Sequence, residues 1–365
     1  MILTYKYRIK DRRSRKALRA HAWAINQVWN YCVAYQRDTE ARYRAGAPKR
    51  KWPGAFDLQR VTAGTSKELG VRAGSITEVC RHFAIARDNR KRAPRFRSSS
   101  GPRRALGWVP FRATDRTLRG NIVKYLGKGY RVWLGNRSFP EQGVKGGAFI
   151  EDGRGRWYVC LAVEVASEER PAGKAVVGID LGLKAVATFS DGRIIEAPRI
   201  YRRHEQRLAI AQRAGNKPRA RALHAKITNC RRDFLHKATT RIARESALIA
   251  VGNVSSSRLA KTRMAKSVLD AGWAMFRAQL RYKASRHGAV YLDIDESFTT
   301  QACSNCGKLP DSSPKGMGAL GIRAWGCSEC GASHDRDVNA ARNILALALS
   351  AQRSAGGSRE IVARA

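Results

Sequence analysis

Two Cys-x-x-Cys pairs constrain this chain more than any other feature, because four thiolates at that spacing can clamp the segment between them. The pairs are Cys303 with Cys306 and Cys327 with Cys330, and 20 residues separate them. Paired knuckles of this kind hold a tetrahedral Zn²⁺ ion, and four protein ligands leave no open position for a substrate. A glycine follows each pair, where a tight knuckle favours positive φ. The sequence therefore predicts a structural zinc site.

The charge of the chain predicts a polyanionic partner. Seventy Lys and Arg residues face 29 Asp and Glu among 365 residues, which gives a formal net charge of +41. A compact state with such an excess repels itself unless a partner neutralises it. Nucleic acid is the expected partner. A membrane surface is disfavoured, because the basic residues are spread along the whole chain and no apolar run reaches the ~18 residues of a membrane span.

The expected compartment is the cytoplasm. The first residues lack the apolar segment of a signal peptide. The four cysteines outside the pairs are Cys32, Cys80, Cys160 and Cys230. They are scattered singly, which fits reduced thiols rather than a disulfide framework.

The first 170 residues combine strands with a helical segment. Residues 3–9 alternate as a strand does, and apolar residues recur at a spacing of three to four over 13–37, as in an amphipathic helix. More helix is expected over 55–92. From Pro94 onward, a basic loop leads to short strands with turns between them, including a hairpin over 149–165. We therefore predict a small β-barrel with the helical segment inserted near its front. Its interleaved basic and aromatic residues suit a nucleic-acid groove, and a plain barrel with exposed arginines explains them equally well.

The second half alternates strands and helices in an order that narrows the fold. The expected strands are 175–179, 183–189, 193–196, 247–251 and 290–294. The expected helices are 200–246, 264–286 and 337–349. The first strand is a continuous apolar run, as in a strand buried on both faces. The order βββαβαβα is that of the ribonuclease H fold, with the cysteine segment inserted before the last helix.

Two aspartates lie where this fold would bring them together. Asp180 ends the first of these strands, where an ionised carboxylate is costly unless it binds something; the alternative is a surface turn. Gly178 and Gly182 would leave room around it for metal and phosphate. Asp337 opens the last helix; the alternative is an N-cap, a role that Asp335 could fill instead. Two-metal phosphodiester hydrolysis needs several carboxylates, so a third is expected.

Residues 174–350 resemble the RuvC-type nuclease domain of TnpB, a family of transposon-encoded RNA-guided nucleases related to type V CRISPR effectors. The matching segments are 178–182, 232–237, 267–273, 299–307 and 335–343. The N-terminal half resembles the family more weakly, at 5–8 and 94–97. The resemblance implies an RNA-guided endonuclease that takes a guide RNA from the transposon end and cuts matching double-stranded DNA. It implies no membrane partner and a nucleoid association through DNA.

The resemblance and the element pattern together imply a mixed fold, α/β plus α+β. It would consist of a ribonuclease H-like (RuvC) domain with an inserted zinc ribbon, preceded by the β-barrel with its helical insert. The expected parts are a wedge-like barrel at 1–10 and 94–172, a helical recognition insert at 11–93, the nuclease domain at 173–297 and 334–350, the zinc ribbon at 298–333, and a flexible tail at 351–365.

One position departs from the family. Members usually carry a glutamate at the end of the fourth strand, where this chain has Gly252 and Asn253. The direct interpretation is a nuclease-inactive, RNA-guided DNA-binding protein that acts as a repressor or transposition regulator. The alternative is a relocated acid. Glu296 follows the fifth strand, faces the same side as Leu292 and Ile294 by the two-residue period, and lies one strand spacing of about 4.8 Å away.

The relocated acid completes the predicted site. Asp180, Glu296 and Asp337 would hold Mg²⁺ (or Mn²⁺) as the catalytic residues of a metal-dependent endodeoxyribonuclease. The competing interpretation is that Glu296 caps or forms an ion pair near the base of the ribbon. A strand-transfer transposase is not favoured by the resemblance.

Overall fold

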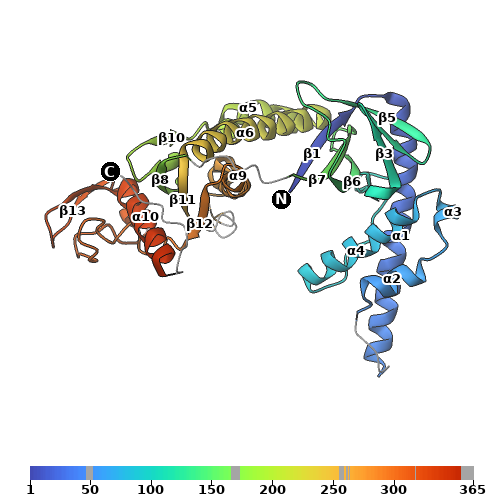
Figure 1. Ribbon diagram of the computed structural model, residues 1–365, viewed down its shortest axis with the longest axis horizontal. Helices are drawn as coiled ribbons and strands as arrows, with labels where there is room; N and C mark the ends of the chain where they lie inside the picture. The colour runs from blue at the N-terminus through green and yellow to red at the C-terminus, as the bar shows by residue number, and fades with distance from the viewer. Residues whose placement is uncertain are drawn as a thin grey trace. The chain divides into compact units, whose positions relative to one another are not determined.

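The structure is a computed structural model that describes residues 1–46, 52–165, 173–254, 259, 262, 264–316 and 318–354. The chain divides into two compact units, Met1–Ala166 and Ser167–Ala365. Figure 1 shows the elements of each unit in colour from the N-terminus to the C-terminus. No helix in the described part of the chain is long and apolar enough to cross a membrane.

The first unit is built on one antiparallel sheet of seven strands. In spatial order they are β2 (Trp108–Arg112), β6 (Val144–Glu151), β7 (Trp157–Glu164), β1 (Ile2–Ile9), β5 (Lys128–Trp133), β4 (Ile122–Tyr125) and β3 (Arg116–Arg119). Side chains of β7 are buried at every second position, which is the period expected when one face of a strand packs on a core. The N-terminal strand therefore lies in the middle of the sheet, although its neighbours are far away in sequence.

This sheet curls but does not close, so the predicted barrel is corrected to a half-barrel. The ring of Tyr130 on β5 lies 5.0 Å from that of Phe149 on β6, and the ring of Phe111 on β2 lies 6.3 Å from that of Tyr125 on β4. Strands far apart in the sheet order thus share one core. No ladder joins β2 to β3 among the described residues.

Helices complete this core on its open side. They are α1 (Arg12–Arg44), α2 (Ala55–Val61), α3 (Ser66–Leu69) and α4 (Ala73–Arg90). The hydroxyl of Tyr125 lies 2.7 Å from the hydroxyl of Ser75 on α4, and its ring meets His21 of α1 edge-on at 5.5 Å. The helix predicted at 13–37 runs on to Arg44. The helical stretch predicted over 55–92 is three helices, because Gly64 and Gly70 adopt positive φ between them.

The second unit contains a five-stranded sheet in the order β10-β9-β8-β11-β12. The strands are β8 (Ala175–Asp180), β9 (Ala185–Phe189), β10 (Ile194–Glu196), β11 (Ser246–Gly252) and β12 (Val290–Ile294). β8, β11 and β12 are parallel, and β9 and β10 return antiparallel beside β8. All five strands predicted in this half are thus present.

The α-helices that the structure describes in this unit are α5 (Ile200–Arg213), α6 (Lys217–Glu245), α8 (Ala265–Ala271), α9 (Trp273–Arg286) and α10 (Arg336–Ser354). Two predicted helices are each divided by a glycine with positive φ, Gly215 and Gly272. α10 runs through the first four residues of the predicted tail. The rest of that tail, from residue 355, lies outside the described residues.

Helices cover both faces of this sheet. Ile249 and Val251 of β11 join a core with residues of α6 and α9, whereas Ala250 between them packs with Ile344 and Ala348 of α10. Alternate residues of one strand therefore face different helices. This explains why β11 is buried at all seven positions and why its sequence is a continuous apolar run.

Gly178 allows α10 to lie directly on β8. A Cβ atom at this position would come 2.0 Å from the carbonyl oxygen of Ala341 and 2.8 Å from the Cβ of Leu345. Sequence reasoning assigned Gly178 to the approach of metal and phosphate. The structure assigns it to helix packing instead.

Gly178→Ala is expected to destabilise the second unit by at least the 1–3 kcal/mol typical of overpacking, because the obstruction is helix backbone that cannot rotate away. Denaturant unfolding measures the loss. Gly321→Ala is the matched control, since a Cβ there meets nothing within 4 Å. Equal stability of the two variants would contradict the packing role.

Candidate active site

The sheet alternation places Asp180 on the face that α10 covers. Gly178 contacts α10, and Asp180 is two residues farther along the same strand, at its carboxyl end. The loop after it is fixed by Trp273 at the start of α9, whose Nε1 donates to the carbonyl oxygen of Gly182 at 3.1 Å. Asp180 thus lies at the carboxyl end of the central strand of the sheet, at the strand end where the sequence placed it.

Glu296 lies over Gly252. Gly252 pairs in register with Ile294, the last residue of β12, so Glu296 follows the strand next to it. A Cβ atom on Gly252 would be 2.9 Å from Oε2 of Glu296 and 3.3 Å from Cδ1 of Ile344. Ile344 belongs to α10. The Glu296 carboxylate therefore occupies the space that a side chain at 252 would need, on the α10 face predicted for it.

A short turn after β12 directs Glu296 to this place. The backbone N–H and the hydroxyl of Thr299 both donate to the carbonyl oxygen of Glu296, at 3.1 and 2.8 Å. Burial raises the pKa of Glu296, the positive charge of Arg277 lowers it, and Asp295 raises it further. No ion pair of the Glu296 side chain is found among the described residues.

Asp337 lies in the first turn of α10 without serving as its cap. Asp335 takes that role, since its Oδ1 accepts from the backbone N–H groups of Asp337 and Val338 at 3.0 and 2.9 Å. The carboxylate of Asp337 is left available and forms an ion pair with Arg323. Asp335 thus fills the capping role that the sequence left open to it.

Two other acids act electrostatically on Asp180. Burial, followed by the negative charges of Asp337 and Glu296, raises the pKa of Asp180 to about 7, and the positive charge of Arg336 opposes this rise. A buried carboxylate whose pKa is raised by neighbouring acids is a candidate functional residue. Asp337 and Glu296 are therefore close enough to Asp180 to raise its pKa.

Asp180→Asn is expected to raise the melting temperature in magnesium-free buffer at pH 8. Asp180 keeps its proton in the folded state up to about pH 7, whereas an unfolded aspartate loses it near pH 4. Wild-type stability therefore falls as pH rises from about 4 to 7. The neutral asparagine avoids that loss, with a gain of about 2–4 °C for each kcal/mol relieved.

Thermal unfolding across pH 4–8 tests this, with exposed Asp311→Asn as the control. Added Mg²⁺ should raise the melting temperature of the wild type and leave Asp180→Asn unchanged. Parallel pH curves for the wild type and Asp180→Asn would contradict the coupling.

Two asparagines on α10 anchor the chain between Glu296 and the first cysteine pair, and sequence reasoning gave them no role. The Nδ2 atoms of Asn339 and Asn343 each donate to the carbonyl oxygens of Thr299 and Ala302, at 2.7 to 3.2 Å. Oδ1 of Asn339 accepts from the N–H of Ser304 at 2.8 Å. The available signal was their four-residue spacing, which places both on one helix face.

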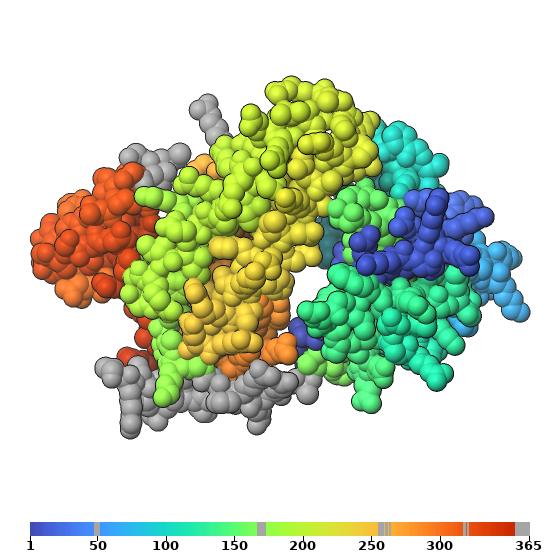
Figure 2. Space-filling model, turned by 90° about the horizontal axis from the view of Figure 1, so that it is seen from above, coloured from blue at the N-terminus to red at the C-terminus, as the bar shows by residue number. Residues whose placement is uncertain are grey.

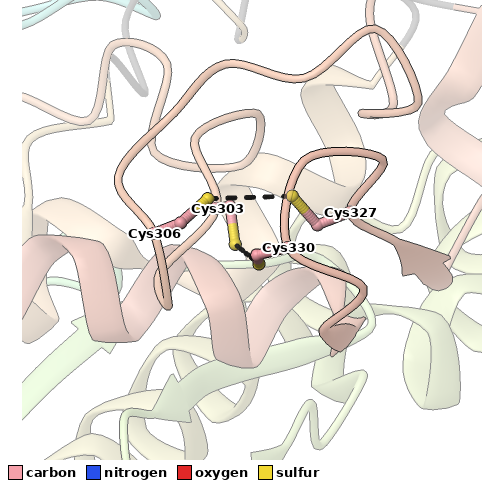
Figure 3. Close-up of side chains that lie close together, drawn as sticks. All are labelled: Cys303, Cys306, Cys327 and Cys330. Atoms are coloured by element: carbon pink, nitrogen blue, oxygen red, sulfur yellow. Dashed lines mark hydrogen bonds between the residues drawn. The ribbon is translucent and has the colours of Figure 1, made fainter.

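The four predicted cysteines converge. Figure 3 shows the thiols of two loops pointing toward one another. The sulfur atoms of Cys303 and Cys330 are 3.6 Å apart and those of Cys306 and Cys327 are 3.8 Å apart, and all four lie within 4.8 Å of one another. Tetrahedral zinc with bonds of about 2.3 Å requires sulfur separations of about 3.8 Å. The donor set therefore fits a zinc ion.

Two knuckles of the same form build this cluster. The N–H groups of Gly307 and Gly331 donate to the carbonyl oxygens of Cys303 and Cys327, and both glycines have positive φ, as predicted. Nε2 of His334 lies 3.0 Å from the sulfur of Cys303. Among the described residues, this is the one group of three or more Cys, His, Asp or Glu side chains whose ligand atoms come so close together. The three carboxylates at the sheet edge are spread more widely.

Two family models match the chain, "Probable transposase" over residues 158–263 and "Cas12f1-like, TNB domain" over residues 273–344. A curated relative from Streptomyces pristinaespiralis, named "Putative RNA-guided DNA endonuclease", is 34% identical over 303 residues, or 78% of this chain and 73% of the relative. The similarly named InsQ of Escherichia coli (strain K12) is 26% identical and is covered over 88% of its length, with 90% of this chain.

A cryo-EM structure of a Cas12f1–sgRNA–target DNA complex aligns with 94% of this chain and 98% of that chain, at 16% identity and a TM-score of 0.37. The assignment rests on the sequence relatives. Their extent and identity show that this chain belongs to the TnpB (OrfB) family of transposon-encoded RNA-guided nucleases.

Proposed function

We propose that this protein is the RNA-guided DNA endonuclease of a transposon and hydrolyses phosphodiester bonds in a RuvC-type site made of Asp180, Glu296 and Asp337. The single observation that carries the proposal is the position of the Glu296 carboxylate over Gly252, 2.9 Å from the missing Cβ. This position supports a carboxylate of Glu296 in the role that the family usually gives to a glutamate at the end of the fourth strand. The sheet order, with three parallel strands and an antiparallel hairpin, supports a ribonuclease H-like domain.

The three carboxylates would hold Mg²⁺ (or Mn²⁺), which supplies charge stabilisation at the scissile phosphate and the departing 3′ oxygen. Asp180 must lose its proton to act as a ligand, and its pKa of about 7 lets it do so near neutral pH. To act as a ligand, Asp337 would give up its ion pair with Arg323. Arg323 then becomes available to a phosphate at the same edge. In this proposal, the protein contributes to catalysis by placing charged side chains at the site and by keeping the side chain of Glu296 turned inward.

The partners we propose are a guide RNA from the transposon end and matching double-stranded DNA. The net charge of +41 supports them, as do the names of the relatives. Figure 2 shows α5 and α6 as a yellow-green ridge on the surface of the second unit. The exposed basic residues of α6 are Lys217, Arg219, Arg221, Lys226, Arg232, Lys237, Arg241 and Arg244. Such a ridge suits the phosphate backbone of a nucleic acid.

The remaining parts receive supporting roles in this proposal. The half-barrel and the helices of the first unit serve as the wedge and recognition parts that grip the nucleic acids. The four cysteines hold a structural Zn²⁺ in a ribbon between β12 and α10. The protein would work in the cytoplasm, at the nucleoid.

The second candidate is a nuclease-inactive, RNA-guided repressor or transposition regulator. It is favoured by the glycine at 252 and by the pairing of Asp337 with Arg323. The deciding experiment is purification with bound RNA, followed by incubation with a matched plasmid, with Mg²⁺ and without it. Cleavage only with Mg²⁺ supports the nuclease. Specific binding without cleavage under both conditions supports the regulator.

A further inference from the structure

A cavity of about 440 Å³ opens beside the loop that follows Asp180. Leu183, three residues beyond Asp180, lines this cavity together with Arg199, Arg202 and Ser267. Its volume falls within the range of about 300–1,000 Å³ that small-ligand sites occupy. The walls combine apolar side chains with cationic groups and a hydroxyl, which suits a sugar joined to a phosphate.

Arg199, at this cavity, has an unusual backbone conformation and is an unusual residue for an N-cap. It has φ 45° and ψ 44°, a left-handed conformation that arginine rarely adopts, and it stands at the N-cap of α5 without a capping hydrogen bond. Hydrogen bonds fix the chain on both sides of this residue. Nε and Nη2 of Arg203 both donate to the carbonyl oxygen of Pro198, and the N–H of Arg203 donates to the carbonyl oxygen of Arg199. Strain maintained in this way is typical of functional positions.

The charges around the cavity leave Arg199 uncompensated. Asp270, which also lines the wall, is already engaged, since both its oxygens accept from the N–H of Tyr201 at 2.9 Å and Nη2 of Arg231 donates to it at 2.8 Å. Arg202 shares Glu205 with Lys266. Arg199 is exposed and has no side-chain partner among the described residues. The cavity lining therefore carries a net positive charge, since Arg199 and Arg202 outnumber the one aspartate, Asp270.

We infer that this cavity binds one sugar–phosphate unit of the DNA strand that enters the acidic site, with Arg199 as the positioning residue. The inference rests on the proposed function. An arginine side chain can grip a phosphate through two parallel N–H groups. A phosphate held beside the loop after Asp180 would fix the register of the strand relative to the three carboxylates.

The test uses the RNA-loaded protein with p-benzoyl-phenylalanine in place of Leu183, bound to labelled matched DNA without Mg²⁺ and irradiated. The wild-type cavity should crosslink to a DNA strand. Arg199→Gly should weaken the crosslink and slow cleavage about tenfold or more, the effect of losing a charged hydrogen bond. It should keep or raise the melting temperature, because glycine tolerates positive φ. Arg199→Lys keeps the charge but lacks the two parallel N–H groups. It should therefore weaken the crosslink and slow cleavage less than Arg199→Gly does.

Arg353→Ala, in the exposed last turn of α10, removes the same charge and should change neither readout. A crosslink to the guide RNA, or a DNA crosslink and cleavage rate unchanged in Arg199→Gly, would overturn the inference. The crosslink needs no cleavage. A protein that crosslinks without cutting would therefore reject the nuclease proposal and leave the cavity assignment standing.

Discussion

Glu296→Ala is expected to abolish DNA cleavage while leaving RNA-guided DNA binding nearly unchanged. The side chain contributes one carboxylate to the proposed metal site, and groups that act as one unit lose most of the activity when one is removed, here on the order of 10³-fold. Binding depends instead on many basic residues spread over both units. Initial cleavage rates of a matched plasmid and equilibrium binding without Mg²⁺ measure the two effects.

Position 252 provides an independent arm of this test. Gly252→Ala places a Cβ 2.9 Å from Oε2 of Glu296, so it should displace the carboxylate and slow cleavage although it removes no charge. Gly252→Glu in the Glu296→Ala background restores an acid to the family's usual place, and recovered cleavage would locate the metal site directly. Asp311→Ala, a fully exposed acid, is the control. Full activity of Glu296→Ala would reject its proposed role.

Cys327→Ser is expected to lose the bound zinc and to unfold the segment between the two cysteine pairs. The local core consists of Cys303, Trp325 and Cys327, with Cys306 and Ala332 packed against it. So small a core cannot fold alone, and zinc binding supplies about 10–16 kcal/mol in comparable small domains. Elemental analysis and limited proteolysis measure the two losses.

Cys230→Ser is the matched control, because Cys230 is an exposed thiol on α6 away from the cluster. It should retain zinc and resist protease as the wild type does. Unchanged zinc content in Cys327→Ser would refute a four-thiolate site. Cleavage should also fall in Cys327→Ser, because β14 (Ser333–Asp335) ends in the residue that caps α10 ahead of Asp337.

Strand and helix positions in the second unit were predictable because burial on two faces leaves an unmistakable apolar run, as in β8 and β11. The breaks at Gly215 and Gly272 were harder to predict, since a glycine within a helical pattern costs only about 1 kcal/mol. The predicted β-barrel is a half-barrel in the structure for a physical reason. Sequence alternation shows that Tyr125 faces a core, but it cannot show that Ser75 and His21 of the helices, rather than another strand, complete that core.

The sequence likewise predicted some residues of the candidate site and not others. Asp180 and the cysteines could be found because a strand end and a paired spacing are local patterns. Gly178 could not be interpreted correctly, because its neighbour Ala341 is more than 160 residues away in sequence. The roles of Asn339 and Asn343 could not be predicted either. Their partners are backbone carbonyl groups, which every residue type carries. Gly252 was the most useful position, because the absence of a side chain there pointed to a relocated acid at Glu296.

The asparagine anchors have a consequence for how this region can change in length. The chain leaves the sheet unit at Thr299–Ser304, where Asn339 and Asn343 hold it, and returns at Asp335, directly before the same helix. Near the return point, the N–H of Arg336 donates to the carbonyl oxygen of Arg323 at 2.7 Å. Entrance and exit are therefore adjacent, and each doubling of the enclosed loop costs only about 0.6 kcal/mol in closure entropy. The exposed loop at Lys315 and Gly316, between the two cysteine pairs, is therefore expected to accept added residues or a foreign domain without moving the sheet end at which Asp180 lies.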